Sequence, residues 1–592
     1  MNEKREKKEN SPRPDWYREE WIDLNGSWQF AFDDDGKGME EEWYREHAYT
    51  TTIQVPFCFQ SKASGIGLAK EAHTRLWYER WLPLEERMRG KRLWLHFGAV
   101  DYSCLVWING KYAGSHKGGF TSHSCEITPY IDWDETDIRI TVACQDDYFV
   151  TQVRGKQHWD LETDRCWYTA TSGIWQNVWM EMTPGYRIEQ ARITPDIDRK
   201  TVEMKLRFSD CPDRGKLVWK LFFQGKEKKQ GVASLQNRME RVLFSVENED
   251  PIDNKIHLWE PGQPNLYDLV LEVYQGGVLQ DRVETYFGMR KIERKGSRIY
   301  LNHYPLYQKL VLDQGYWQES LMTPPDAQAL VRDLKLAQDM GFNGVRKHQK
   351  IEDPRFLYYA DRMGMLVWEE MPSFYAFDEA GVQGFTQEYT EMIERDYNHP
   401  CIIAWVPFNE SWGIRDVLWD KAQQAFAKSI YFLTKALDAG RLVSTNDGWE
   451  AVQTDMIGIH DYEDDPAKLH EVYARKEELM AYTAVGKMIC SEDFVYTDEP
   501  VLLSEFGGIA LEDGRQESWG YHEKARDAEV LKEKIEGILQ VVHKLPYLSG
   551  YCYTQLTDVE QETNGLLYAD RMPKLALEQI RAVFADSSVK SN

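Results

Sequence analysis

The sequence predicts a multidomain protein of β and α/β structure: an N-terminal jelly-roll β-sandwich, an immunoglobulin-like β-sandwich and a C-terminal TIM (β/α)8 barrel. Three observations predict this fold class. A chain of 592 residues is too long for a single hydrophobic core. Its first half alternates short aromatic or β-branched runs with turn clusters, whereas its second half alternates short apolar strands with longer amphipathic helices. We expect domains at residues 1–184, 185–287 and 288–592.

The first two domains are predicted from short β-type segments that are separated by turns. In the first domain, Lys91–Phe97 and Cys104–Ile108 are rich in aromatic and β-branched residues, and the second of these runs precedes an Asn109-Gly110 hairpin turn. In the second domain, Val202–Phe208 alternates apolar and polar residues, and the turn-rich Trp259–Asn265 precedes the last pair of strands. Both patterns are typical of β-sandwiches.

The third domain is predicted from the regular alternation of strand and helix that follows Phe287. The expected helices include Pro325–Met340, Pro354–Arg362 and Trp419–Leu437. The eight expected strands lie at Gln308–Leu312, Gly344–Lys347, Leu366–Glu370, Ile402–Phe408, Leu442–Thr445, Met456–Ile459, Leu502–Glu505 and Gly550–Tyr553. This alternation predicts a closed parallel barrel, in which chemistry takes place at the carboxyl ends of the strands.

Two of these strands end in a glutamate, and this is the most informative feature of the sequence. The apolar run Ile402–Phe408 is followed by Asn409-Glu410, and Leu502–Ser504 is followed by Glu505 and a glycine-rich loop. In a barrel both carboxyl groups lie at the same rim. Hydrolysis of a glycosidic bond with retention needs one carboxylic acid and one carboxylate nucleophile about 5 Å apart. We therefore expect Glu410, kept protonated by apolar surroundings and the nearby carboxylate, to be the acid/base and Glu505 the nucleophile.

Composition argues against several other classes of protein. The formal net charge of −26 disfavours binding to nucleic acid or to an anionic membrane. No apolar run approaches the roughly 20 residues of a membrane span, and the charged residues 1–13 lack the pattern of a secretory signal. The nine cysteines include no Cys-x-x-Cys pair, which predicts free thiols. We expect a cytoplasmic protein.

Six segments carry motifs that are specific for one family of enzymes. They are Thr171–Gln176, Phe287–Arg290, Gly341–Arg346, Asn398–Gly413, Leu503–Gly508 and Gln555–Leu566. On these motifs the chain resembles glycoside hydrolase family 2, the group of β-galactosidases, β-glucuronidases and β-mannosidases. The resemblance extends over nearly the whole chain and implies the same three-domain architecture.

The resemblance also implies roles for four polar residues around the two glutamates. It implies that Asn409 hydrogen-bonds the 2-hydroxyl of the sugar and that Arg346 keeps the nucleophile ionised and oriented. Tyr462 stands where such enzymes place a tyrosine that hydrogen-bonds the nucleophile. His460 is expected to line the sugar site.

Weaker candidates for the pocket follow other strand ends. They are Asp313 and Trp317 after the first strand, His348 and Lys350 after the second, Glu370 at the end of the third, Trp412 after the fourth, Asn446, Asp447 and Trp449 after the fifth, and Tyr553 in the eighth. Tyr553 stands where related enzymes usually carry a pocket tryptophan. For each of these residues the alternative is a rim hydrogen bond or core packing without ligand contact.

Departures from the family pattern bear on the metal and on the sugar. The acidic-x-His pair that helps to bind Mg2+ in large β-galactosidases is replaced by Glu369-Glu370-Met371, so we expect no catalytic metal and no other cofactor. The Asn-x-Lys motif that holds the substrate carboxylate in β-glucuronidases has no match between residues 564 and 574. A uronic acid is therefore disfavoured, unless Lys347 or Lys350 supplies the cation.

The sequence thus predicts a metal-independent, retaining exo-β-glycosidase that acts through a covalent glycosyl-Glu505 intermediate. β-Galactose is the favoured terminal sugar, and the alternatives are a β-glucuronide or galacturonide, a β-glucoside, an arabinoside or a xyloside. The alternative outside the enzymes is a non-catalytic carbohydrate-binding protein. The expected partner is a glycoside or oligosaccharide. The sequence leaves open whether the chain forms a homo-oligomer and whether two loops of the first domain, Gly65–Leu68 and Gln152–Gln157, reach the pocket.

Overall fold

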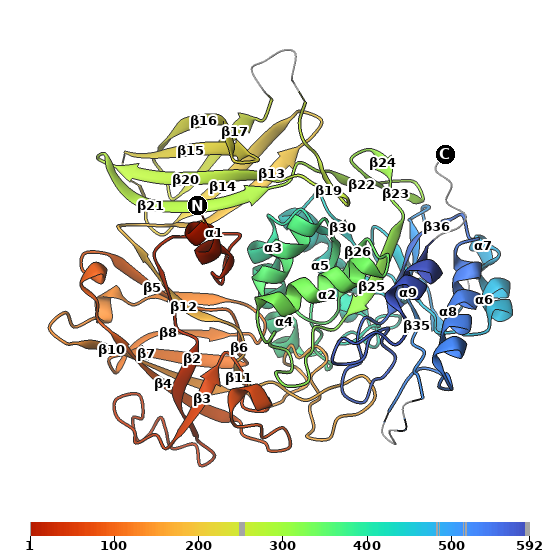
Figure 1. The fold of residues 1–592 in the computed structure, drawn as a ribbon, viewed down its shortest axis with the longest axis horizontal. Helices are drawn as coiled ribbons and strands as arrows, with labels where there is room; N and C mark the ends of the chain where they lie inside the picture. Colours follow the sequence, from red (N-terminus) through yellow and green to blue (C-terminus); the bar gives the residue numbers. More distant parts are fainter. Residues whose placement is uncertain are drawn as a thin grey trace.

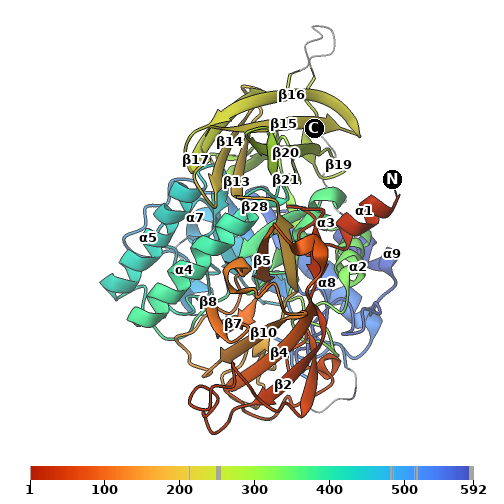
Figure 2. The ribbon, with the colours of Figure 1, turned by 90° about the vertical axis from the view of Figure 1, so that its left-hand side faces the viewer.

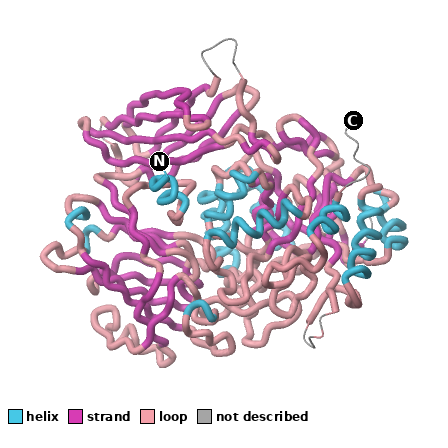
Figure 3. Tube along the Cα trace, viewed as in Figure 1, coloured by secondary structure: helices cyan, strands magenta, loops and turns pink. Residues whose placement is uncertain are grey.

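The chain folds into two β-sandwiches that lie along one side of a barrel (Figure 1). The computed structural model describes residues 2–585 except 213, 248–254, 481–482, 485, 513 and 515–517. The second sandwich lies above the N-terminal sandwich in this view, and both lie beside the barrel. The view turned by 90° shows the same order of the two sandwiches (Figure 2). Most helices lie in the barrel, whereas the regular structure of the sandwiches is mainly strand, joined by loops (Figure 3). The predicted fold class is confirmed.

The N-terminal domain consists of two antiparallel sheets that pack face to face around their own core. The six-stranded sheet has the order β3 (Thr51–Val55), β2 (Gly26–Phe32), β4 (Arg75–Pro83), β10 (Asp137–Gln145), β7 (Ser103–Ile108) and β8 (Lys111–Lys117). The four-stranded sheet has the order β1 (Trp21–Asp23), β12 (Val178–Thr183), β5 (Arg92–Phe97) and β9 (His123–Glu126). Strands β6 (Val100–Asp101) and β11 (Gly173–Ile174) form a separate short pair.

The second domain is a smaller sandwich with a three-stranded and a four-stranded sheet. The first contains β13 (Ile188–Asp196), β14 (Thr201–Phe208) and β17 (Met239–Ser245), and the second contains β16 (Lys226–Leu235), β15 (Gly215–Phe223), β20 (Tyr267–Gln275) and β21 (Val278–Phe287). In β14 and β15 buried side chains alternate with more exposed ones, so each strand places one face on the core. This alternation is the period-two pattern seen in the sequence.

The barrel is an eight-stranded parallel sheet that curls on itself. Its order is β30 (Leu442–Val443), β28 (Ile402–Val406), β27 (Leu366–Glu370), β26 (Gly344–Lys347), β25 (Gln308–Asp313), β36 (Leu548–Thr554), β35 (Val501–Gly507) and β32 (Ile457–His460). The fourth strand stops earlier than predicted, because Pro407 has no N–H to give to the ladder. The chain resumes as β29 (Phe408–Asn409), which pairs with β31 (Asn446–Asp447).

The helices cover the outside of the barrel and most begin at an aspartate cap. They are α2 (Ala327–Asp339), α3 (Pro354–Met363), α4 (Glu379–Asp396), α5 (Lys421–Leu437), α6 (Pro466–Tyr473), α7 (Lys476–Leu479), α8 (Ala528–Val542) and α9 (Leu577–Phe584). The side chain of Asp326 accepts a hydrogen bond from Ala329 N at the start of α2, and Asp353 caps α3 ahead of Pro354. Such caps satisfy backbone N–H groups that the first helical turn leaves without partners.

The N-terminal domain is joined to the barrel by a shared core and by backbone hydrogen bonds. Phe120, Tyr168 and Trp175 belong to the same buried cluster as the barrel core. The backbone N–H groups of Arg154 and Gly155 donate to Ser373 O at 2.9 and 3.0 Å. The segment that follows β10 is thereby fixed on the barrel rim.

The start of the chain also packs against the folded domains. Residues Asn2–Glu9 form α1, and Lys8 makes an ion pair with Glu284 of the second sandwich at 3.6 Å. None of the helices in the described part of the chain is long and apolar enough to cross a membrane.

Candidate active site

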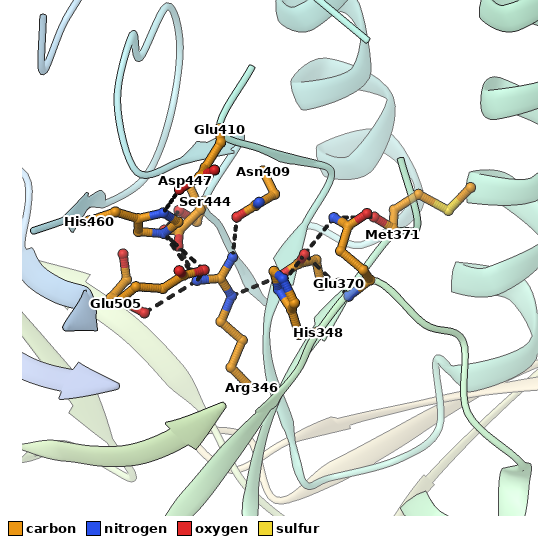
Figure 4. A network of polar contacts seen from close by, with 12 residues as sticks. Arg346, His348, Glu370, Met371, Asn409, Glu410, Ser444, Asp447, His460 and Glu505 are labelled. Atoms are coloured by element: carbon orange, nitrogen blue, oxygen red, sulfur yellow. Dashed lines mark hydrogen bonds and ion pairs between the residues drawn. The ribbon is translucent and has the colours of Figure 1, made fainter. Parts of the chain in front are cut away.

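Arg346 lies at the centre of a buried polar network at the carboxyl ends of the barrel strands (Figure 4). From β26 its Nε donates to Glu370 Oε2 at 2.6 Å, and its Nη2 donates to Asn409 Oδ1 at 2.7 Å. Its Nη1 lies 3.0 Å from Glu505 Oε1 and 2.7 Å from Asp447 Oδ2. The planar guanidinium carries five N–H donors in a rigid fork, so one side chain can orient residues from four strand ends.

His460, at the end of β32, connects the two glutamates that the sequence singled out. Its Nδ1 lies 2.9 Å from Glu410 Oε1, and its Nε2 lies 2.9 Å from Asp447 Oδ2 and 3.5 Å from Glu505 Oε1. Burial lowers the pKa of His460, but the surrounding carboxylates, Glu505 first, outweigh it and raise the pKa to about 10. His460 is therefore an imidazolium near pH 7 and donates from both ring nitrogens.

Glu505 ends β35 with its carboxylate held between cationic and phenolic partners. Besides Arg346 and His460, the Tyr462 hydroxyl donates to its Oε2. Burial raises the pKa of Glu505, but the positive charges of His460 and Arg346 outweigh burial, so the pKa is below its ordinary value. The carboxylate is ionised near neutral pH, the state in which a carboxylate can act as a nucleophile.

Glu410 is presented by a strained turn at the end of β29. Glu410 and Ser411 have φ of 53° and 57°, a region that L-residues rarely adopt and that costs of order 1–3 kcal/mol each. Their backbone N–H groups donate to Asp447 O and Asn446 Oδ1, both at 2.9 Å, which holds the turn. The Glu410 side chain is 19% exposed and hydrogen-bonds His460. The expectation of apolar surroundings for Glu410 is therefore wrong.

The two glutamates lie as close as a retaining glycosidase requires. Carboxylate oxygens of Glu410 and Glu505 and a ring nitrogen of His460 all lie within 4.8 Å of one another. Carboxyl groups about 5–5.5 Å apart are typical of retention, whereas inversion needs about 6.5–9.5 Å to admit a water molecule.

Other candidates from the sequence also lie in or beside this network. His348 Nδ1 is 3.0 Å from Glu370 Oε1. Asp447 accepts a hydrogen bond from Ser444 Oγ at 2.9 Å, in addition to its contacts with Arg346 and His460. Trp449 is half-buried with its ring edge-on to His460, at 5.7 Å between centroids.

Trp412, two residues after Glu410, lies in a cluster of aromatic rings. It is half-buried, and its ring centroid lies 5.6 Å from that of Tyr375 and 5.7 Å from that of Trp167 of the N-terminal domain. The contact with Trp167 shows that the first domain borders the candidate site.

Asp313 and the two nearby lysines do not belong to the Arg346 network. Lys347 Nζ is 2.7 Å from Asp313 Oδ2 and 3.0 Å from Glu352 Oε2, and Lys350 Nζ is 2.6 Å from the same Glu352 oxygen. Trp317 lies against Lys350, 5.1 Å from Nζ to the ring centroid. Lys347 and Arg346 are adjacent in a strand, so their side chains point to opposite faces. The structure pairs Asp313 with Lys347 and places it outside the Arg346 network, so it does not support the expectation that Asp313 lines the sugar site. Lys347 and Lys350 are both occupied by buried ion pairs.

Tyr553 is also placed away from the network. Its ring packs edge-on against Phe506 and Phe584, at 5.4 and 5.3 Å between centroids, and Phe584 belongs to helix α9. Because side chains alternate along a strand, Tyr553 faces the helix layer and Thr554 faces the rim, where its Oγ1 lies 3.3 Å from the Tyr462 hydroxyl. Core packing, the alternative weighed for Tyr553, is what the structure shows.

Sequence reasoning did not single out two residues that border the site. Tyr521 stacks on Tyr462 with ring centroids 3.5 Å apart and planes 4° from parallel. Lys156 reaches the rim from the N-terminal domain, and the only signal for it was the Gln152–Gln157 loop, whose destination the sequence left open. Tyr521 had no signal, because the loop that carries it follows β35 without a regular pattern.

Two groups of described residues bring potential metal-ligand atoms within 4.8 Å of one another. One is Glu410, His460 and Glu505, and the other is Asp361, His399 and Cys401. In both groups a histidine already hydrogen-bonds a carboxylate, His460 to Glu410 at 2.9 Å and His399 to Asp361 at 2.6 Å. These hydrogen bonds account for the clustering. The absence of a catalytic metal stays a prediction.

Comparison with family models decides the classification. The model for "Glycosyl hydrolases family 2, sugar binding domain" matches residues 22–184, that for "Glycosyl hydrolases family 2" matches 186–290, and that for "Glycosyl hydrolases family 2, TIM barrel domain" matches 292–588. The chain belongs to glycoside hydrolase family 2. The resemblance stated from the sequence motifs is confirmed.

Relatives within glycoside hydrolase family 2 carry two different activities in their names. A β-galactosidase of Thermoanaerobacter pseudethanolicus is 27% identical over 346 residues, 57% of this chain and 44% of that protein. A β-glucuronidase of Streptococcus agalactiae is 22% identical over 544 residues, 85% of this chain and 87% of that protein. The chain spans less than half the length of the first of these relatives.

Solved structures of the family share the fold of this chain. The structure of a β-glucuronidase from an uncultured Clostridium species matches with a TM-score of 0.77, at 21% identity, over 96% of this chain and 98% of that one. A β-galactosidase structure from Bacteroides fragilis, described as putative, matches with the same TM-score at 18% identity, over 96% and 85%. Likeness at this level of identity shows the fold alone.

Proposed function

We propose that this member of glycoside hydrolase family 2 is a retaining exo-β-glycosidase, with Glu505 as nucleophile and Glu410 as acid/base. The observation that carries the proposal is the approach of the two carboxylates within 4.8 Å at the carboxyl rim of the barrel. A binding protein would have no need of a buried carboxylate that Arg346, His460 and Tyr462 hold ionised. The non-catalytic alternative is therefore disfavoured.

In the first step Glu505 attacks the anomeric carbon while Glu410 protonates the departing oxygen. The negative charge of Glu505 also stabilises the positive charge that develops on the sugar in the transition state. In the second step Glu410, now a carboxylate, removes a proton from water, which displaces Glu505. The His460 imidazolium, 2.9 Å from Glu410, stabilises the carboxylate form that Glu410 takes between the two steps.

The sugar expected from the sequence is β-galactose, and the name of the Thermoanaerobacter relative supports it. The names of other relatives support a β-glucuronide as the second candidate. Both sugars present the same equatorial bond to the two carboxylates. The catalytic pair is therefore compatible with either, and groups outside the pair must decide.

Hydrolysis of a panel of 4-nitrophenyl β- and α-glycosides tests the proposal. We expect one or more β-glycosides to be cleaved with retention, without loss of rate in a chelator. The Glu505→Ala variant should lose about 10⁴-fold or more in kcat. If the Glu505→Ala variant still cleaves the substrate at a rate near that of the wild type, Glu505 is not the nucleophile.

A second variant separates the acid from the nucleophile. Glu410→Ala should slow natural glycosides much more than 4-nitrophenyl glycosides, because a good leaving group needs little protonation. Equal loss on both substrates would contradict the acid/base role. Azide added to Glu410→Ala should restore turnover and give a β-glycosyl azide, which a structural role for Glu410 would not produce.

A further inference from the structure

Lys156 belongs to the N-terminal domain, yet its ammonium group faces the candidate active site. The Nζ atom lies 5.2 Å from the ring centroid of Trp412 and 5.9 Å from that of Tyr168. Trp412 is two residues after Glu410 in the barrel. The side chain of Lys156 is 4% exposed, so the cation lies inside the space between the two domains.

The backbone around Lys156 is fixed on the barrel by several hydrogen bonds. Tyr168 N donates to Lys156 O at 2.8 Å, and His158 N donates to Tyr168 O at 2.9 Å, which pairs the two arms of the loop. The next residue, Gln157, donates from Nε2 to Asp101 Oδ2 at 2.7 Å. On the other side Gly155 N donates to Ser373 O of the barrel at 3.0 Å. A backbone fixed in this way limits the positions that the Lys156 ammonium can reach, which lowers the entropy lost when it binds a ligand.

The groups that act electrostatically on Lys156 include both proposed catalytic glutamates. Burial lowers the pKa of Lys156, but Cys166, Glu562, Glu505 and Glu410 outweigh burial and raise it. Burial raises the pKa of Cys166 to about 12, so the thiol that hydrogen-bonds Lys156 is neutral near pH 7, and the ionised Glu505 is a source of the negative charge around the ammonium. No described carboxylate makes an ion pair with Lys156, in contrast to Lys347 and Lys350.

Glu562 already has its own partners. Its Oε2 accepts from the Tyr168 hydroxyl at 2.5 Å and its Oε1 accepts from Asn564 Nδ2 at 3.0 Å. The ammonium of Lys156 thus hydrogen-bonds the neutral Cys166 thiol and lies within electrostatic range of Glu562 and Glu505, but it forms no ion pair with a described carboxylate. The terminal sugar of a glycoside must lie against Glu410 and Glu505, and Trp412, two residues after Glu410, brings the Lys156 ammonium next to that position.

We propose that Lys156 is a specificity-determining residue that binds an anionic group, a carboxylate or a sulfate ester, on the terminal sugar. The inference deepens the proposed glycosidase function and rests on it. A buried ammonium without a bonded counter-charge is a strong site for an anion, because burial strengthens a charge-assisted hydrogen bond and penalises an unpaired charge. The N-terminal domain then completes the pocket of the barrel.

The test compares anionic and neutral 4-nitrophenyl glycosides that share one configuration. The substrates are the β-galacturonide, the β-galactoside and the 6-O-sulfo-β-galactoside, with the β-glucuronide and β-glucoside as a second matched pair. We expect the wild type to have a higher kcat/KM for an anionic substrate than for the neutral substrate of the same configuration. Whether a uronide or the sulfated glycoside is cleaved faster then shows whether the site binds a carboxylate or a sulfate ester. Lys156→Met should lower the ratio of kcat/KM for the anionic to the neutral substrate by about 30-fold or more. Lys156→Arg should keep part of the preference.

The control variant is Lys111→Met, an exposed lysine in β8 of the same domain, which should leave the ratio unchanged. A wild type that prefers the neutral member of both pairs would overturn the inference and leave the glycosidase proposal intact. Equal loss on anionic and neutral substrates in Lys156→Met would also overturn it, since that result indicates a structural role.

A binding measurement separates this inference from failure of the catalytic proposal. In the Glu505→Gln background, which needs no turnover, calorimetry with the anionic glycosides should show an affinity that Lys156→Met weakens about 30-fold. Affinity that is independent of residue 156 would contradict the inference whether or not the enzyme is active. Absence of turnover together with Lys156-dependent binding would instead contradict the proposed catalysis alone.

Discussion

Replacement of His460 by glutamine tests the electrostatic account of the nucleophile. Glutamine retains hydrogen-bonding capacity but removes the positive charge that lies 3.5 Å from Glu505 Oε1. At an effective dielectric constant of about 20, unit charges at that distance interact by about 5 kcal/mol, the equivalent of about 3.5 pH units. Arg346 remains 3.0 Å from Glu505 and offsets part of this loss. We therefore expect the pKa of Glu505 to rise by about one to three units.

The assay is the pH profile of kcat/KM for the best substrate, with thermal unfolding measured at each pH. The acidic limb of the profile reports ionisation of the nucleophile in the free enzyme, so it should move to higher pH in His460→Gln. Melting curves show whether the variant stays folded across the range. An acidic limb that is unchanged within about 0.3 unit, or that moves to lower pH, would refute the reasoning.

Four further predictions follow from single contacts. Tyr462→Phe removes a hydrogen bond to Glu505 and should lower kcat about 10- to 100-fold, measured by steady-state kinetics. Tyr553→Phe should change kcat less than about twofold, because the contacts of its ring are with Phe506 and Phe584. Lys347→Met leaves Asp313 without its buried partner and should lower the free energy of unfolding by about 3–5 kcal/mol in urea titration, without a change in KM. The pKa of His460 is raised from 6.5 to about 10 in the folded protein. Protonated His460 therefore stabilises the folded state fully below pH 6.5, and this stabilisation is lost as the pH rises through 10. The melting temperature of the wild type should fall more between pH 6.5 and 10 than that of His460→Gln, measured by thermal unfolding.

The architecture could be predicted from the sequence because it depends on short-range patterns. Alternation of apolar and polar residues predicted the strands of the sandwiches, and short apolar strands followed by amphipathic helices predicted the barrel. The strand ends at Glu410 and Glu505 followed from the same patterns, since parallel strands bring their carboxyl ends to one rim. The break at Pro407 could also have been anticipated, because proline cannot donate to a ladder.

The partners of individual side chains were less predictable. Asp313 and Tyr553 both stand near strand ends, but Asp313 pairs with Lys347 and Tyr553 faces helix α9. In each case a shift of one residue along a strand moves a side chain to the other face of the sheet. Position in a motif therefore indicated the right strand without indicating the right face.

By itself the sequence determined the order of the domains, the barrel and the two glutamates that meet at its rim, because these follow from local periodicity and from the geometry of parallel strands. Only the tertiary structure decided that Glu410 contacts a charged His460 and not apolar groups, and that Lys156 from another domain faces the same pocket. Side chains 50 residues apart, as in His460 and Glu410, or more than 250 apart, as in Lys156 and Trp412, meet only after folding. Their protonation states depend on burial and on neighbours that lie far away in the sequence.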